Sequence, residues 1–221
     1  MSNEYTVSKQ NKVRQLKEKA AYDKATVHAI LDAGIVAAVA FIQDNDPVVV
    51  PMLYGREGET IYLHGARKAR IIKMLEQNDS VSMNVTLLDA LVLARSAFNS
   101  SMNYRSVTVF GKPAFIEDRA EKIHAMHVIS EHTMPGRWAE LRAPLEKEIK
   151  MTGIISLTIE SASAKASDKP YPEDEAEDYE IPVWAGILPM TASYGTLQDA
   201  DRLIEGVEPS AAVKALQGKT L

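Results

Sequence analysis

Apolar and polar residues alternate along much of the chain, a period-two pattern typical of half-buried β-strands. Other segments are short apolar runs rich in β-branched residues, which also favour strands. The predicted strands are residues 35–42, 48–54, 60–64, 81–87, 106–115 and 152–161. Pro51 lies inside the second of them, so we expect that residue at a sheet edge or a bulge. These segments predict a mainly β protein.

Between the strands, apolar residues recur every three or four positions, which predicts amphipathic helices. The predicted helices are residues 24–33, 66–77, 118–132 and a shorter one at 146–150. Asp23 is a good N-cap for the first helix, and Gly34 is placed to end it in left-handed conformation. Strands joined mostly as hairpins, with helices between them, suggest an antiparallel barrel with helices packed outside. We expect residues 1–161 to form this domain, and 162–221 to be a loop-rich extension packing on the barrel or on a partner subunit.

Composition limits the classes of function. The 221 residues are 46% hydrophobic and 25% charged, ordinary values for a soluble globular protein. The longest apolar run is far shorter than the roughly 20 residues of a membrane span, and no secretory signal pattern begins the chain, so we expect a cytoplasmic protein. The sequence has no cysteine, which excludes disulfides, thiolate catalysis and iron–sulfur clusters. Any redox chemistry therefore belongs to a bound cofactor.

The net charge of −5 is distributed unevenly. Residues 168–180 hold seven acidic side chains and one lysine, a local charge of −6 that leaves +1 for the rest of the chain. Prolines inside this segment predict an exposed loop, either a solvated connector or a docking segment for a basic partner. Basic residues near the N-terminus are not interleaved with aromatic ones, so we expect no nucleic-acid partner.

The most informative local feature is residues 62–70, where a predicted strand ends in His64-Gly65-Ala66 and a predicted helix opens with Arg67, Lys68 and Arg70. Cations are unfavourable at a helix N-terminus because of the helix dipole. A bound anion reverses that argument, since free backbone N–H groups and arginine side chains together make a phosphate site. The alternative is that Arg67 and Lys68 simply point to solvent.

Other candidate features are weaker. Glu121, His124, His127 and Glu131 lie near one face of a predicted helix, but they favour a solvated face over a metal site, and we expect no metal. Residues 99–106 are dense in hydrogen-bonding groups and form either a binding loop or a surface turn. Trp184 follows the acidic segment and is placed to cover a ligand, enter the core or contact another subunit. Gly-x-Ser-x-Gly, P-loop and Gly-x-Gly-x-x-Gly motifs do not occur.

A series of motifs gives the chain a family resemblance. They are Val50-Pro51-Met52 with Tyr54, Tyr62–Ala66, Thr86–Asp89, Leu93–Phe98, Met102–Ser106, Phe110-Gly111, Glu121-Lys122, Pro135–Trp138 and Pro182–Gly186. In order and spacing they cover about residues 13 to 190. The chain resembles the FMN-binding split-barrel proteins related to pyridoxamine 5′-phosphate oxidase, in the branch that includes the nitroimidazole-resistance proteins. The resemblance implies an antiparallel split β-barrel with flanking helices, and a homodimer with FMN at the subunit interface.

The resemblance also implies the cofactor-binding residues. Those that match the strand along the flavin ring are Pro51, Met52 and Tyr54. Those that match the turn beside the ribityl chain and phosphate are His64, Gly65 and Ala66, with Arg67 and Arg70 as the basic residues of the phosphate site. Those that match the rest of the pocket are Tyr104, Arg105 and Ser106, with Trp184 covering it from the partner chain. His64 and Arg105 are candidates to stabilise the reduced, anionic flavin, and no acid–base catalyst stands out.

Together these features predict an FMN-dependent oxidoreductase acting on a small-molecule substrate or electron donor. The alternative is a non-catalytic carrier of flavin or of another planar cofactor, such as haem or deazaflavin. A haem would take His64 or a histidine of the third helix as axial ligand. The vitamin B6 oxidases proper use a basic C-terminal ending, whereas Arg202 is the only arginine after Trp184 here. We therefore do not expect oxidation of pyridoxamine 5′-phosphate.

Overall fold

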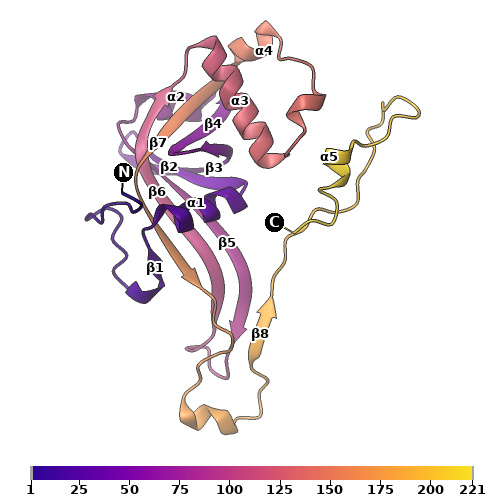
Figure 1. The fold of residues 1–221 in the computed structure, drawn as a ribbon. Coiled ribbons are helices and arrows are strands. Elements are labelled where there is room, and N and C mark those ends of the chain that lie inside the picture. Colours follow the sequence, from indigo (N-terminus) through magenta and orange to yellow (C-terminus); the bar gives the residue numbers. More distant parts are fainter. Residues whose placement is uncertain (1, 221) are drawn as a thin grey trace.

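The computed structural model of the chain describes residues 2–220. An antiparallel sheet of eight strands curls into a barrel in the order β7-β4-β3-β2-β5-β6, which closes where β6 pairs with β7 (Figure 1). The strands are β1 (Ala20–Ala21), β2 (Val36–Gln43), β3 (Asp46–Glu57), β4 (Thr60–Ala66), β5 (Val81–Leu93), β6 (Ser101–Phe115), β7 (Thr152–Ser167) and β8 (Gly186–Pro189). The predicted mainly β split barrel is confirmed.

Helices α1 to α4 lie around the barrel, and α5 lies on the C-terminal extension (Figure 1). They are α1 (Lys24–Ala33), α2 (Arg70–Gln77), α3 (Arg119–Thr133), α4 (Glu146–Met151) and α5 (Ala211–Lys214), with 3-10 turns at Lys17–Lys19, Trp138–Glu140 and Ala176–Glu180. Helix α3 packs closely on β3 because Gly55 has no side chain, and a Cβ there would lie 2.7 Å from Ile129 Cα. None of the helices in residues 2–220 combines the length and apolarity that a membrane span requires.

The core fills the barrel with the inward-pointing residues of the strands. Fully buried members include Val39, Tyr54, Ile61, Leu63, Met83, Ile155 and Leu157. Ile72 and Leu75 of α2 join them. Each such aliphatic side chain contributes about 1.5–3 kcal/mol through burial. The Tyr54 hydroxyl donates to the Leu31 carbonyl, so the one polar atom of that side chain is satisfied inside the core.

Helix α1 begins as predicted and ends differently. The Asp23 carboxylate accepts a hydrogen bond from the Thr26 N–H at 2.8 Å, which confirms the N-cap. The prediction of a left-handed Gly34 is wrong, since its φ is −88°. Glycine is required there for space instead, because a Cβ would lie 2.4 Å from Val85 Cγ1.

The hairpin of β5 and β6 is longer than predicted, and part of residues 99–106 is strand instead of loop. Asp89 forms a bulge in β5, where the register shifts between Leu88 and Ala90. Its carboxylate forms an ion pair with Arg105 of β6 at 2.7 Å. Asp89 and Arg105 interrupt the apolar–polar alternation of the sequence, and in the structure they pair with each other across the two strands.

Strand β3 is paired on both sides along only part of its length. Strand β2 pairs with residues 46–53, whereas β4 pairs with Tyr54–Glu57. Pro51 thus pairs with Ala38 of β2 and lies on the half of β3 that is open on its β4 side, a local edge of the kind where proline is tolerated in a sheet. This position agrees with the prediction of a local edge.

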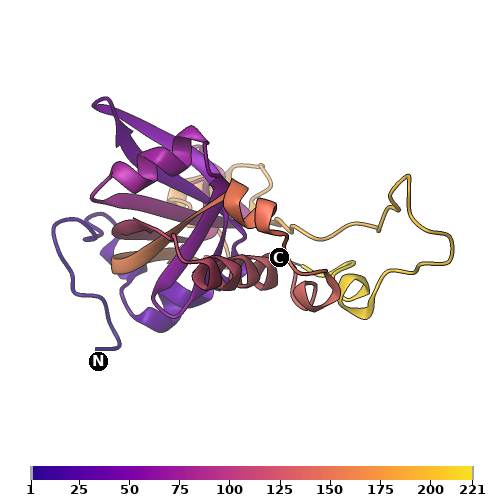
Figure 2. The same ribbon diagram turned by 90° about the horizontal axis from the view of Figure 1, so that it is seen from above.

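The C-terminal extension begins after Ser167 and not at residue 162 as predicted. Strand β7 continues to Ser167, six residues beyond the predicted strand end at residue 161. Most of the acidic segment is exposed as predicted, but the Asp174 side chain is fully buried and forms an ion pair with Arg95 at 2.8 Å. Strand β8 then pairs with β5, and the remaining chain forms an arm that reaches away from the barrel (Figures 1 and 2). The arm returns through α5, where Ala212 lies beside Gly136.

Candidate functional site

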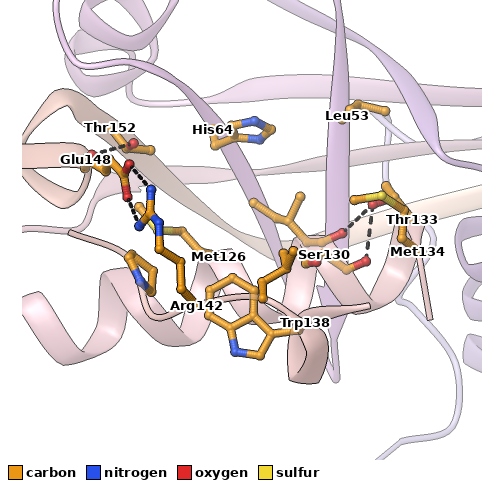
Figure 3. A pocket seen from close by; sticks show the side chains of 13 residues that line it. Leu53, His64, Met126, Ser130, Thr133, Met134, Trp138, Arg142, Glu148 and Thr152 are labelled. Carbon is orange, nitrogen blue, oxygen red and sulfur yellow. Dashed lines mark hydrogen bonds and ion pairs between the residues drawn. The ribbon is translucent and has the colours of Figure 1, made fainter. Parts of the chain in front are cut away.

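A cavity of about 550 Å³ lies between the outer face of the barrel and the segment that joins α3 to α4. Its lining is mainly apolar, from Leu53, Met126, Ile129, Met134, Trp138, Leu141 and Pro144. The polar lining residues are His64, Ser130, Thr133, Arg142, Glu148 and Thr152. Figure 3 shows His64 and Leu53 on one side and Trp138 and Arg142 on the other. This size and composition are those of a small-molecule or cofactor site, for which about 300–1,000 Å³ is usual.

Strand periodicity places His64 in this cavity. Ile61 and Leu63 of β4 point into the barrel and are fully buried. Successive side chains on a strand point to opposite faces, so Tyr62 and His64 point outward, toward α3. Tyr62 packs against the buried cluster of Ile116, Ala125 and Ile154, which includes a residue of α3. The same alternation that builds the core therefore delivers one imidazole to the cavity.

The surroundings of His64 favour its neutral form. Burial among protein atoms lowers the pKa of its imidazole below the ordinary value, and burial alone causes this shift. The ring is nevertheless accessible from the open cavity, and it has no hydrogen-bonding partner among the described residues. A neutral imidazole carries a lone pair on one ring nitrogen, so His64 is able to accept a proton or ligate a metal there.

Ser130 contributes an unsatisfied polar atom to the same cavity. Its Oγ is buried and has no hydrogen-bond partner among the described residues. Leaving a buried hydroxyl unpaired costs about 1–3 kcal/mol. A bound ligand in the cavity is in position to relieve that cost.

Arg142 and Glu148 form a charged pair at the rim of the cavity. The guanidinium nitrogens of Arg142 lie 2.6 and 3.0 Å from the two Glu148 carboxylate oxygens. The Glu148 carboxylate also accepts the Leu145 N–H at 2.8 Å. The hydrogen bonds from Arg142 are the largest cause that lowers the pKa of Glu148 to about 2. The rim of the mainly apolar cavity therefore carries an ion pair, in which Glu148 compensates the charge of Arg142.

The predicted phosphate site begins later in the sequence than expected. Helix α2 starts at Arg70 and not at residue 66, because Ala66 still pairs with Thr152 in the sheet. The Arg67 N–H donates to the Met151 carbonyl at 2.8 Å. Ala69 is the N-cap of α2 and supplies no side-chain cap, so the first N–H groups of the helix are free for a ligand.

The three cations near α2 have different environments. Arg67 is engaged inside the chain, with its guanidinium carbon 3.9 Å from the Phe115 ring centroid and an ion pair to Glu76 at 3.1 Å. It therefore does not simply point to solvent. Lys68 and Arg70 are exposed and have no ion-pair partner among the described residues. The cations available to an anion at the start of α2 are these last two.

Two glycines fix the start of α2 against the sheet. Gly65 of β4 pairs with Gly153 of β7. A Cβ at Gly65 would lie 3.1 Å from Ile72 Cγ1, and one at Gly153 would lie 2.6 Å from Ile72 Cγ2. Because neither position has a side chain, Ile72 packs directly on the paired strands. The glycines thereby set where Arg70 and the free N–H groups lie.

The remaining predicted site residues are dispersed in the protomer. On β3, the Pro51 side chain is exposed, whereas Met52 and Tyr54 are buried in the core. His64 pairs with Ile154 on β7, while Arg105 pairs with Ala166 on that same strand. Twelve residues of strand correspond to about 40 Å at roughly 3.3 Å per residue. One protomer therefore does not bring the His64 turn and the stretch containing Tyr104, Arg105 and Ser106 into one pocket.

Two further predicted features have structural partners. Arg105 is bound by Asp89, and the hydrogen bond to that carboxylate is the main cause that raises the pKa of the guanidinium. Trp184 lies on the extension and is 68% exposed. It stays a candidate for contact with another subunit. Of the helix residues weighed as metal ligands, His124 binds Glu57 at 2.8 Å, and residues 2–220 contain no metal-binding group of three or more His, Cys, Asp or Glu side chains.

The sequence interpretation missed the α3 side of the cavity. Met126, Ser130 and Met134 recur at intervals of four residues, which places them on one helical face. That spacing was a usable signal, although the opposing strand residue His64 lies more than sixty positions earlier. Trp138 was part of a family motif without an assigned role.

Comparisons with known proteins agree with the barrel architecture. A family model described as pyridoxamine 5′-phosphate oxidase matches residues 23–166. The structure of the flavocytochrome Anf3 from Azotobacter vinelandii is 35% identical, with a TM-score of 0.88 over 96% of this chain and 98% of that one. The structure of the FAD and heme binding protein from Mycobacterium smegmatis is 33% identical, with a TM-score of 0.85 over 90% and 98%.

A more distant structure is that of a candidate 5-nitroimidazole antibiotic resistance protein from Bacteroides thetaiotaomicron. It is 26% identical, with a TM-score of 0.58 over 66% of this chain and 85% of that one. A search of curated proteins found no match to this sequence.

Proposed function

The chain belongs to the pyridoxamine 5′-phosphate oxidase family of split-barrel proteins, and from this premise we propose that it is a flavin-dependent oxidoreductase of small molecules. One observation carries the proposal: the start of α2 has free N–H groups and two cations, Lys68 and Arg70, without an ion-pair partner among residues 2–220. The names of the two full-length relatives, a flavocytochrome and an FAD and heme binding protein, support a flavin as the ligand.

The start of α2 suits the phosphate of a flavin nucleotide. A helix N-terminus carries positive partial charge and exposes N–H donors, so it binds anions. The Arg70 guanidinium adds a charge-assisted hydrogen bond to a phosphate oxygen. Riboflavin 5′-phosphate is common to FMN and FAD, and this is the part of either cofactor that we assign to the site. We propose FMN as the cofactor, and chromatography of the flavin released by denaturation distinguishes it from FAD.

The flavin supplies the electron-accepting and electron-donating chemistry when bound, and the chain binds and orients it. The exposed outer face of β3 at Pro51 is the surface that we assign to the flavin ring. Arg105 was a candidate to stabilise the reduced flavin, but its fork with Asp89 reduces the charge it offers. His64 has no such partner among the described residues, but it lines the cavity beneath α3 that we assign to haem below, so we do not assign it to the flavin ring.

We also propose a homodimer with the flavin sites at its interface. Exposed apolar side chains gather on the paired strands β2 and β3, where Val36 is 48%, Val49 62% and Leu53 43% exposed. Burying that face against a second copy stabilises the pair through the hydrophobic effect. A partner is also what brings Tyr104–Ser106 and Trp184 near the His64 turn, given their separation in one protomer. Light scattering at low micromolar concentration is expected to give twice the protomer mass.

Haem is the second cofactor that we propose, because a specific observation favours it. The cavity beneath α3 is mainly apolar and holds one histidine, as a haem site requires. The names of both full-length relatives include haem or a cytochrome. A non-catalytic carrier of these cofactors is the alternative to an enzyme. Anaerobic addition of NADH or NADPH separates the two, since bleaching of the flavin bands is expected for the enzyme and no bleaching for the carrier.

The phosphate assignment is tested by replacing Arg70. Removing a hydrogen bond to a charged group costs about 1.5–3 kcal/mol, so Arg70→Ala is expected to weaken FMN binding by roughly 10- to 100-fold. Riboflavin, which lacks the phosphate, is expected to bind both proteins equally. Calorimetric titration of apoprotein measures both ligands, and Lys112→Ala on the exposed side of β6 is the matched control. Equal losses for FMN and riboflavin would contradict the assignment.

A further inference from the structure

We propose that the C-terminal arm, residues 191–220, is a strap that keeps the cavity between β4 and α3 closed. Its helix α5 rests on the turn that carries Trp138, a residue of the cavity wall, and release of α5 opens that wall. Closure of the cavity by α5 does not depend on which ligand the cavity holds. Only the hemin measurement described for it rests on the proposed function.

Helix α5, yellow in Figure 2, contacts the chain beside the cavity. Gly136 lies in the turn after α3, and a Cβ at that position would lie 3.1 Å from Ala212 Cβ. The Ser210 hydroxyl donates to the Glu140 carboxylate, and this hydrogen bond is the largest cause that lowers the pKa of that carboxyl. Residues 201–208 of the arm are exposed, whereas Ala212 is half-buried. Burial along the arm therefore returns where α5 meets the turn.

The turn beneath α5 is tied to the cavity wall. The Glu131 carboxylate accepts the Gly136 N–H at 2.7 Å and the Trp138 N–H at 3.1 Å. One side chain of α3 thus fixes both the residue beside α5 and the residue that lines the cavity. The Trp138 ring lies opposite His64 in Figure 3 and packs edge-on against His127, with ring centroids 5.7 Å apart. A displacement of Gly136 therefore moves Trp138.

Helix α5 is held by few contacts and is able to move. It has four residues, and isolated helices shorter than about 12–15 residues are marginal in water, so it depends on its contacts with the turn. At Gly195, Gly206 and Gly218 of the arm, a Cβ would meet nothing within 4 Å among the described residues. Gly206 and Gly218 also have positive φ, 79° and 75°, which glycine adopts without strain. These glycines are suited to act as hinges.

The base of the arm is anchored on the barrel. The Met190 N–H donates to the Asp89 carbonyl of β5 at 2.9 Å. The two legs of the arm pair with each other, because the Tyr194 N–H donates to the Lys219 carbonyl at 3.0 Å and the Gly218 N–H donates to the Tyr194 carbonyl at 2.9 Å. With its base fixed on β5 and its helix resting on the turn, the arm has the geometry of a strap.

The first test locks α5 in place with a disulfide, since the chain has no cysteine of its own. Cβ atoms of bonded cysteines lie about 3.5–4.5 Å apart, so Gly136→Cys combined with Ala212→Cys is placed to form one. The oxidised double variant is expected to release hemin to excess apomyoglobin more slowly than its reduced form, by about 5-fold or more, the lower end of couplings between two sites. Gly136→Cys alone is the control, because it measures the effect of a side chain at the φ of 82° found there.

The second test needs no haem. Trp184→Phe leaves Trp138 as the one tryptophan of the sequence, and acrylamide quenching of its fluorescence in the apoprotein measures how open the wall is. In that background Ser210→Ala removes the N-cap of α5 and the bond to Glu140, and is expected to increase the quenching constant. Ser210→Thr keeps the hydroxyl and is expected to restore the parent value. Thr196→Ala, on an exposed part of the arm, is expected to change nothing.

Several results would overturn the inference. They are equal quenching constants for Ser210→Ala and its parent, equal rates of hemin release from the oxidised and reduced double variant, or no disulfide in that variant. A disulfide between two chains, seen as a dimer on a non-reducing gel, would also contradict it, since α5 would then rest on the turn of a partner. A protein that binds no hemin, but in which Ser210→Ala opens the wall, would refute the haem assignment and leave the strap standing.

Discussion

The two ends of the barrel differ in whether their basic side chains have acidic partners. Around the β5–β6 hairpin each arginine discussed above has a carboxylate partner, Asp174 for Arg95 and Asp89 for Arg105. Around the start of α2, Lys68 and Arg70 have no ion-pair partner among the described residues. Arg95 and Arg105 lie in family motifs, and the resemblance assigns Arg70 to the phosphate, so the resemblance alone does not distinguish the two ends.

This difference separates structural charges from those available to a ligand. A buried carboxylate such as Asp174 is compensated inside the chain, and removing its partner leaves an unpaired charge in a protein environment. An exposed cation at a helix N-terminus is unfavourable until an anion binds. We therefore assign the hairpin charges to stability, and Lys68 and Arg70 at the start of α2 to cofactor binding.

The largest expected effect is at the hairpin end. Asp174→Ala leaves Arg95 without its ion pair and its N–H without an acceptor, and is expected to lower the free energy of unfolding by about 3 kcal/mol. Urea denaturation measures the change. Glu173→Ala in the same acidic segment is the control, because its pair with Lys169 is exposed, and no measurable change is expected. Similar losses for both variants would remove the distinction between buried and exposed pairs.

A smaller effect is expected from crowding the base of α2. Gly153→Ala introduces a Cβ 2.6 Å from Ile72 Cγ2, and overpacking of this kind costs about 1–3 kcal/mol. Since Ile72 positions the start of α2, FMN affinity is expected to fall as well as stability. Denaturation and FMN titration measure the two. Gly195→Ala, where a Cβ meets nothing within 4 Å, is expected to change neither. If stability falls while FMN affinity is unaltered, the start of α2 does not bind the FMN phosphate.

The smallest effect is the pH dependence that His64 gives the apoprotein. Its folded pKa is lowered, so as pH falls the unfolded chain binds a proton first, near the ordinary pKa of about 6.5. Stability is therefore present above that pH and declines as pH falls below it, until the folded pKa is passed. Unfolding free energies of wild type and His64→Gln, compared between about pH 5 and 8, isolate this contribution. The unfolding free energy of wild type minus that of His64→Gln is expected to decrease as pH falls. If this quantity is constant with pH, or increases as pH falls, the assignment is contradicted.

The barrel was predictable because its causes are local. Alternation through Val81, Met83 and Val85 places a strand, and the Asp23 side chain starts α1 where the sequence indicated. Strand ends were less predictable. Asp89 and Arg105 interrupt the apolar pattern of β5 and β6, and only their pairing across the hairpin explains why the strands continue.

The site was predictable in part. The turn at His64 and the cation at Arg70 are visible in the sequence because strand, glycine and helix follow in order. The contact between Arg67 and the Phe115 ring was not predictable, since it joins residues 48 positions apart in the sequence. The far wall of the cavity is likewise supplied by α3, and the packing of α3 on β3 depends on the bare backbone of Gly55.

One absorption measurement tests the central claim most directly, that the α2 end holds two cofactors through two different residues. Wild type, Arg70→Ala and His64→Gly are each equilibrated with FMN and hemin, freed of unbound ligand, and their flavin and Soret bands recorded. The account predicts that Arg70→Ala loses the flavin bands and keeps the Soret band, and that His64→Gly does the reverse. The account is contradicted if either variant loses the flavin and Soret bands together. It is also contradicted if both variants keep both bands.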